Sequence, residues 1–173
     1  MAKAFIAGEQ NRALDVIHRM LDTIGGTFSY QAREAEGTQP PAETLRSRSG
    51  TCRDYAWLMI EALRRIGFAC RFITGYIYDG ALDSGGASGV TGSGATHAWV
   101  QVYLPGAGWL HYDPTNRITG GTDLVPVAIA RHPAQAIPLQ GSWFGNAGDF
   151  RGMSVKVAIR KLKTLSDDIG APV

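Results

Sequence analysis

The stretch from Thr96 to Asn116, THAWVQVYLPGAGWLHYDPTN, decides the fold because it predicts two paired strands. Its first half alternates between an apolar face and a second face, the first with Ala98, Val100, Val102 and Leu104, the second with His97, Trp99, Gln101 and Tyr103. The connection Pro105-Gly106-Ala107 has a length that antiparallel hairpins use. It pairs Leu104 with Gly108, and the same register sets Trp99 opposite Asp113.

This register predicts a contact between a histidine and a carboxylate. His97 becomes a diagonal neighbour of Asp113 on one face, at a Cα separation of roughly 7–8 Å that the two side chains can close. A connection one residue shorter or longer would move the two side chains to opposite faces. Taken singly, a strand histidine is usually structural, and an aspartate before a proline such as Pro114 usually forms a turn.

The stretch SRSGTCRDYAWL, Ser47 to Leu58, predicts a helix that begins near Cys52, with Ser49 or Thr51 as its N-cap. The unpaired N–H groups and the dipole of a helix N-terminus favour a thiolate there. The backbone N–H of Cys52 could also bind a developing oxyanion. The alternative is a small buried residue packed against the sheet, which is common for a free cysteine.

The three residues together fit the chemistry of an activated thiol. His97 would take the proton of the Cys52 thiol and later protonate the leaving group. Asp113 would fix the tautomer of His97 and stabilise its imidazolium. The sequence does not assign a second oxyanion donor, for which Tyr30 and Gln31 are only candidates.

The rest of the chain predicts an α+β fold, with helices first and a run of antiparallel strands after them. We expect helices at 11–24, where Gly25-Gly26 supplies the stop, and at 52–66, with one further turn at 41–45. The expected strands are 69–78, 96–104, 109–113, 124–131 and 153–165. A glycine- and serine-rich stretch, 79–95, predicts a surface loop that could gate a cleft.

Composition excludes several function classes. The chain has 173 residues, a net charge of +2 and scattered basic residues, which argues against nucleic-acid binding. No apolar run has the ~18 residues of a membrane span, and the N-terminus does not resemble a signal peptide. Two cysteines, Cys52 and Cys70, fit a reducing compartment better than a disulfide framework. We therefore expect a cytoplasmic protein.

Neither a metal nor a cofactor is expected. Cys52, Cys70, His97 and His111 lack the C-x-x-C or H-x-x-x-H spacing of zinc sites. The sequence has no acidic loop of the calcium-binding type. The glycines of 85–94 are not followed by the Lys-Ser/Thr of a phosphate loop.

Three motifs resemble the bacterial transglutaminase-like proteins of the papain-like thiol superfamily. They are SGTCRDYAWLMIEALRRIGFACRFITGY from Ser49, THAWVQVYLPGAGWLHYDPTN from Thr96 and HPAQAIPLQGSWFGNAGDFRGMSVKVAI from His132. The resemblance implies a papain-like core over 1–173 as a single catalytic domain, with the nucleophile Cys52 at a helix start packed on an antiparallel sheet. By the same resemblance, His97 takes the position of the family's catalytic base and Asp113 that of its acid.

The resemblance implies acyl transfer from a peptide or protein substrate, with water as the expected acceptor. Amine transfer, as in a transglutaminase, is the alternative, and a non-catalytic binding module on the same fold is a third. Longer members carry an additional N-terminal β-domain that this chain lacks. Animal-type transglutaminases have a tryptophan upstream of the cysteine, whereas all four tryptophans here follow Cys52.

Five further residues are candidates for supporting roles. Arg53 and Asp54 point in different directions on the helix, so each is expected to bind a loop or a cap. Trp57 could line the cleft or pack in the core. Trp99 shares the face of His97 and could shield the ion pair from water, and Asn116 could hold the DPTN turn.

Overall fold

The computed structural model describes residues 1–6, 12–32, 37–137, 141–142, 144–149, 151–152, 154 and 156–162. Its helices are η1 (Ala2–Ile6), α1 (Ala13–Thr27), α2 (Pro41–Ser47), α3 (Cys52–Arg64), α4 (Gly80–Asp83), η2 (Pro133–Gln135) and η3 (Ala147–Asp149). Its strands are β1 (Ser29–Tyr30), β2 (Ser49–Gly50), β3 (Cys70–Ile77), β4 (His97–Leu104), β5 (Gly108–Asp113), β6 (Ile118–Thr119) and β7 (Leu124–Ala130). The predicted α+β class is confirmed. No helix in these ranges is both long and apolar enough to cross a bilayer.

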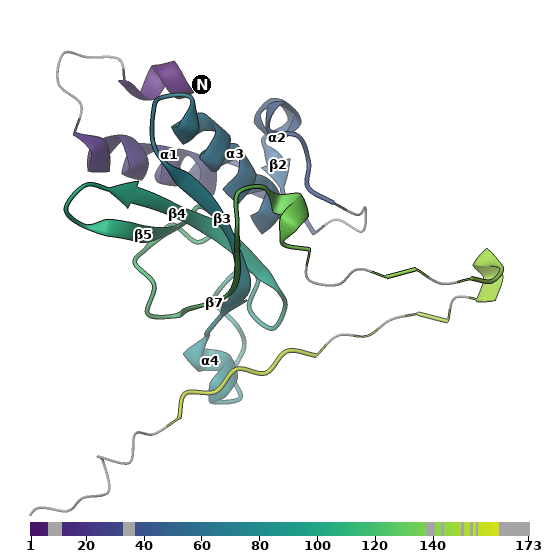
Figure 1. The fold of residues 1–173 in the computed structure, drawn as a ribbon. Coiled ribbons are helices and arrows are strands. Elements are labelled where there is room, and N and C mark those ends of the chain that lie inside the picture. The colour runs from purple at the N-terminus through teal and green to yellow at the C-terminus, as the bar shows by residue number, and fades with distance from the viewer. Residues whose placement is uncertain are drawn as a thin grey trace, which may run out of the picture.

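The main sheet has five antiparallel strands in the order β6-β5-β4-β3-β7. Leu104 pairs with Gly108 and Val100 with Tyr112, which is the register that the three-residue connection predicts. Figure 1 shows α1 and α3 on one side of this sheet, with β4 and β5 as a long hairpin.

The main core lies between these helices and the sheet. The apolar face of β4 takes part in it through Ala98, Val100 and Val102, each with no exposed surface. The opposite face of β4 contributes Trp99 to a second, smaller cluster with Ile73, Ile77 and Leu124. Both faces of the strand are therefore buried, which explains why a residue of either face, including His97, can be withdrawn from water.

A small parallel pair, β1 and β2, brings the end of α1 to the start of α3. Tyr30 pairs with Gly50, two residues before Cys52, and the N–H of Gln31 donates to the carbonyl of Gly50. These two strands could not be predicted from the sequence, because two residues are too few to show alternation.

Two sequence predictions are wrong. The first helix does not stop at Gly25-Gly26 but continues to Thr27. A Cβ on Gly25 would lie 2.6 Å from both the Pro114 carbonyl oxygen and the Arg117 Cγ. Gly25 therefore serves close packing of the helix against the turn after β5, and not helix termination.

The second wrong prediction is the strand expected at 153–165. Residues 154 and 156–162 form no strand, and the remainder of the prediction lies outside the described residues. The N–H of Lys161 donates to Asp83 of α4, and Figure 1 shows this segment running beside α4. Val157 and Ile159 are half-buried there, so their alternation reflects packing on α4 and not pairing in a sheet.

Candidate active site

The start of α3 is held by a capping box. Thr51 is the N-cap, and the carboxylate of Asp54 accepts hydrogen bonds from its N–H at 2.9 Å and its hydroxyl at 3.0 Å. Asp54 also accepts from the N–H of Gln39 at 2.6 Å, and it is fully buried. The prediction that Asp54 binds a cap is confirmed.

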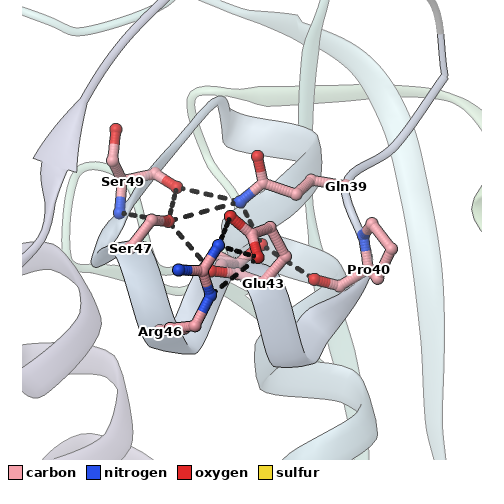
Figure 2. Close-up of polar contacts among 7 residues, drawn as sticks. Gln39, Pro40, Glu43, Arg46, Ser47 and Ser49 are labelled. Atoms are coloured by element: carbon pink, nitrogen blue, oxygen red, sulfur yellow. Dashed lines mark hydrogen bonds and ion pairs between the residues drawn. The ribbon is translucent and has the colours of Figure 1, made fainter.

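Gln39 links this cap to α2. Its side-chain amide donates to Thr44, Ser47 and the carbonyl of Ser49, as Figure 2 shows in part. The loop before α2 and the strand before Cys52 are thus tied to the same helix terminus. Cys52 is the first residue of that helix, so its backbone N–H is not used by the helix.

His97 and Asp113 form a buried pair. His97 Nε2 lies 2.9 Å from Asp113 Oδ2, and neither side chain has exposed surface. The contact predicted from the hairpin register is confirmed. Burial raises the pKa of Asp113, but hydrogen bonds from His97, Asn116 and the Thr115 N–H outweigh it and lower that pKa, so the carboxylate is ionised.

Cys52 interacts with the other side of the imidazole. Burial lowers the pKa of His97, but the hydrogen bond to Asp113 and the nearby Cys52 outweigh burial and raise the pKa to about 10. Asp113 occupies Nε2, whereas Nδ1 is buried and makes no hydrogen bond, so Nδ1 is the nitrogen left to take a proton from Cys52. The structure therefore brings Cys52, His97 and Asp113 together in that order.

The sulfur is not enclosed in hydrocarbon. Cys52 and His97 line an open pocket of about 290 Å³ whose other described walls include Tyr30, Gly37, Thr51 and Arg53. Cys52 thus borders the pocket, although only 6% of its surface is exposed.

Tyr30 is the functional candidate for which the sequence offered least support. Burial first, and then the neighbouring Cys52, raise the pKa of its hydroxyl to about 12. The side chain and the backbone of Cys52 both lie close enough to this hydroxyl to influence its pKa. Pairing of β1 with β2 places it there, and no local pattern in the sequence signals that pairing. The other candidate, Gln31, is exposed and is not among the described residues that line the pocket.

Trp99 and Asn116 support the pair from two sides. The Trp99 ring stacks on His97 at a centroid distance of 6.0 Å, is fully buried, and donates its indole N–H to His111. The ring therefore covers one face of the imidazole. Asn116 donates to Asp113 at 2.8 Å and also binds both the N–H and the carbonyl of Thr91. Asn116 thus holds more than its own turn, since it also ties the glycine-rich loop to Asp113.

That loop packs directly on the imidazole at Gly92. Its φ is +88°, and a Cβ there would lie 2.7 Å from His97 Nδ1. A side chain at this position would therefore displace the ring nitrogen that interacts with Cys52.

Arg53 and Trp57 lie to one side of the thiol. The guanidinium of Arg53 donates to the carbonyls of Pro133 and Ala136, which confirms that it binds a loop. Trp57 is half-buried and packs edge-on against His132 at 4.7 Å between centroids. Trp57 does not line the thiol pocket but a neighbouring one.

Cys70 is a free, buried cysteine that does not line the thiol pocket. Burial raises the pKa of its thiol to about 12. Within the described ranges, no three side chains of His, Cys, Asp or Glu gather closely enough to hold a metal ion.

Comparison with known proteins identifies the family. The profile of the transglutaminase-like superfamily matches residues 1–114, which include Cys52, His97 and Asp113. An uncharacterised protein of Mycobacterium leprae is 30% identical over 142 residues, which cover 82% of this chain and 46% of that protein. The chain belongs to the transglutaminase-like superfamily, and it spans less than half the length of this relative.

Two further similarities concern named activities. A protein-glutamine gamma-glutamyltransferase of Pseudomonas aeruginosa is 38% identical over 72 residues, or 42% of this chain and 11% of that protein. The crystal structure of a proposed cysteine protease from Cytophaga hutchinsonii has a TM-score of 0.61 at 24% identity, covering 78% of this chain and 43% of that one. The structural likeness establishes the same fold, a helix-and-sheet core of the transglutaminase and papain type.

Proposed function

We propose that this protein is a thiol-dependent acyl-transfer enzyme that hydrolyses a peptide or amide bond through Cys52, His97 and Asp113. The observation that carries the proposal is the position of His97. It bridges an ionised, buried carboxylate and a cysteine that begins a helix and lines an open pocket. These are the parts that an activated thiol requires.

The first half-reaction forms a thioester. Cys52 Sγ attacks the carbonyl carbon of the substrate as its proton passes to His97, so that an S–C bond forms. The C–N bond then breaks, and the His97 imidazolium gives its proton to the leaving amine. Asp113 accepts a hydrogen bond from the imidazolium throughout, which accounts for the raised pKa of His97.

The second half-reaction consumes water. A water molecule attacks the thioester carbonyl while His97 takes its proton, and the C–S bond breaks to release the acid and restore the thiolate. We propose that the Cys52 N–H and the Tyr30 hydroxyl hold the oxyanion in both steps. The hydroxyl lies beside the Cys52 N–H at the thiol pocket, and its pKa of about 12 keeps it protonated and able to donate to a bound oxyanion. Tyr30→Phe should then lower kcat by about 10- to 1000-fold.

Alkylation by iodoacetamide tests the activated thiol. Mass spectrometry of each cysteine, at several pH values, should show Cys52 modified rapidly below pH 7 while Cys70 stays unmodified. In the His97→Ala variant the reactive form of Cys52 should require a higher pH. Slow and similar modification of both thiols would refute the proposal.

Amine transfer is the second candidate, favoured by the similarity to the Pseudomonas gamma-glutamyltransferase. The chemistry is the same up to the thioester, and only the acceptor differs. Incubation of the acyl-enzyme with a labelled primary amine distinguishes the two. Hydrolysis without a labelled amide product would exclude the transferase, and a labelled amide that exceeds the acid would favour it.

A further inference from the structure

A second pocket adjoins the thiol pocket and has no role in the chemistry described above. Its volume is about 380 Å³, and it shares two lining residues, Gly37 and Arg53, with the pocket of Cys52. The two cavities therefore lie next to each other beside the first turns of α3.

The second pocket is lined mainly by apolar groups. Trp57 forms one wall, and the other apolar contributors are Pro40, Pro41, Pro133, Ala134 and Ile137. Among its described lining residues only Arg53 and His132 can carry a charge, and neither charge is negative. Such a surface suits a large uncharged side chain and disfavours a cationic one.

The walls are fixed before any ligand binds. Trp57 packs against His132 on one side and lies under the guanidinium of Arg64, 5.5 Å from the ring centroid, on another. Arg53 anchors the Pro133–Ala136 segment through two hydrogen bonds of 2.9 and 3.2 Å and stacks over Phe72. A preformed wall loses little entropy on binding, so burial of an apolar side chain there would contribute directly to affinity.

The second pocket lies on the side of Cys52 where the acyl portion of the substrate is expected. His97 lines the thiol pocket but not the second pocket. Because His97 must protonate the leaving amine, the leaving group lies on the His97 side, and the acyl portion extends toward Arg53 and Trp57. Five residues separate Cys52 from Trp57, which is about 7.5 Å along a helix and matches about two residues of extended peptide.

We infer that this pocket is a specificity subsite that binds a large apolar side chain on the acyl side of the substrate, about two residues from the scissile carbonyl. The inference rests on the proposed function, since it needs Cys52 as the attacking group. It narrows the substrate class to peptides with an aromatic or branched aliphatic residue at that place.

Peptidyl chloromethyl ketones test the subsite. In the parent probe, acetyl-Gly-Ala-Ala-Gly-chloromethyl ketone, Phe or Lys replaces each residue in turn, and the rate of Cys52 modification is followed by intact mass. Phe at the second or third residue from the ketone should raise the rate about tenfold or more over the parent probe, which has Ala there, and Lys should not. This preference should disappear in Trp57→Ala and in Ile137→Ser.

Leu45→Ser is the matched control. Leu45 lines a different apolar pocket, between α2, α3 and the N-terminus, and this variant should keep the Phe preference. Ile137 is 46% exposed, so its variant tests the subsite even where Trp57→Ala fails to fold.

The outcomes separate the two proposals. Equal rates for the parent probe and the Phe probes, with rapid iodoacetamide modification of Cys52, would overturn the subsite and leave the thiol chemistry intact. A Phe preference that survives both subsite variants would overturn it as well. Iodoacetamide modification of Cys52 no faster than that of Cys70 would overturn the proposed function and the subsite with it.

Discussion

The two cysteines of this chain are equally withdrawn from solvent and have opposite environments. Cys52 is 6% exposed and Cys70 is 8% exposed. Cys70 begins β3 in the main core, where burial raises the pKa of its thiol to about 12 despite the nearby Arg64. Cys52 begins α3, next to an imidazole that a carboxylate orients. Exposure alone therefore does not distinguish the two thiols, whereas the charges and dipoles around each sulfur do.

Removal of each sulfur in turn should give the largest contrast. Cys52→Ser should reduce the hydrolysis of p-nitrophenyl acetate, a general thiol substrate, by at least about 10³-fold, because the nucleophile is lost. Cys70→Ala should stay within a few-fold of the wild type. Loss of activity in Cys70→Ala, with the fold intact by circular dichroism, would contradict the assignment of these roles.

The two strand histidines offer the next contrast. His97→Ala should slow alkylation of Cys52 at pH 6 by about 100-fold or more, because the thiolate loses its cationic partner. His111 lies on the next strand and contacts Trp99, so His111→Ala should slow alkylation far less. The pH profile of alkylation should move to higher pH only in His97→Ala. Identical shifts in both variants would mean that the effect is structural.

The hairpin shows what sequence can predict and why. Its register follows from alternation and from a three-residue connection, so the contact of His97 with Asp113 could be derived without coordinates. The start of α3 was also predictable, because Thr51 and Asp54 form a sequence-local cap. Local rules are sufficient where the partners lie on neighbouring elements of a hairpin or within one helical turn.

The remainder of the site depends on contacts between distant segments. Tyr30 reaches Cys52 through a two-residue parallel pair, and Gly92 reaches His97 through a long loop. The second pocket joins α3 to the Pro133 segment across 80 residues of chain. The strand predicted at 153–165 failed for a related reason, since alternation in Val157 and Ile159 reports a half-buried face and cannot report what covers it.

The His97–Asp113 pair predicts how stability changes with pH. The pKa of His97 rises to about 10 on folding, so its contribution is complete below about pH 6.5 and disappears as the pH approaches 10. The pKa of Asp113 falls on folding, so its contribution is present above about pH 4 and disappears as the pH falls through the folded value. Asp113→Asn should lower Tm most between pH 5 and 6.5, where both contributions are present.

Thermal unfolding of both proteins from pH 5 to 10 measures this difference. The difference in Tm should shrink steadily above pH 7, because the wild type loses the ion pair that the variant never had. A constant difference across the range would show that the pair contributes through packing alone. Cys70→Ala supplies the control, since its own difference from the wild type should not change between pH 5 and 9.

The helix terminus that separates the two cysteines can be weakened without touching either sulfur. Asp54 is fully buried and accepts three hydrogen bonds through its two carboxylate oxygens. In Asp54→Asn one of these oxygens becomes an NH₂ group, which would face an N–H or O–H donor, so at least one hydrogen bond is lost. We expect a loss of about 1–3 kcal/mol in the free energy of unfolding by urea. Glu43→Gln is the matched control: Glu43 accepts from Arg46 in an exposed ion pair, whose removal should cost below about 0.5 kcal/mol.

A positioning role for Asp54 requires more than lost stability. If the capping box aims the N-terminus of α3 at the sulfur, Asp54→Asn should also slow alkylation of Cys52 at pH 6 by a few-fold under conditions where the protein stays folded, because the N–H groups near the thiolate are less well ordered. The rate for Cys70, denatured and native, should be the same as in the wild type. A variant that loses stability while Cys52 keeps its full rate and pH profile would place the difference between the two thiols in the imidazole alone.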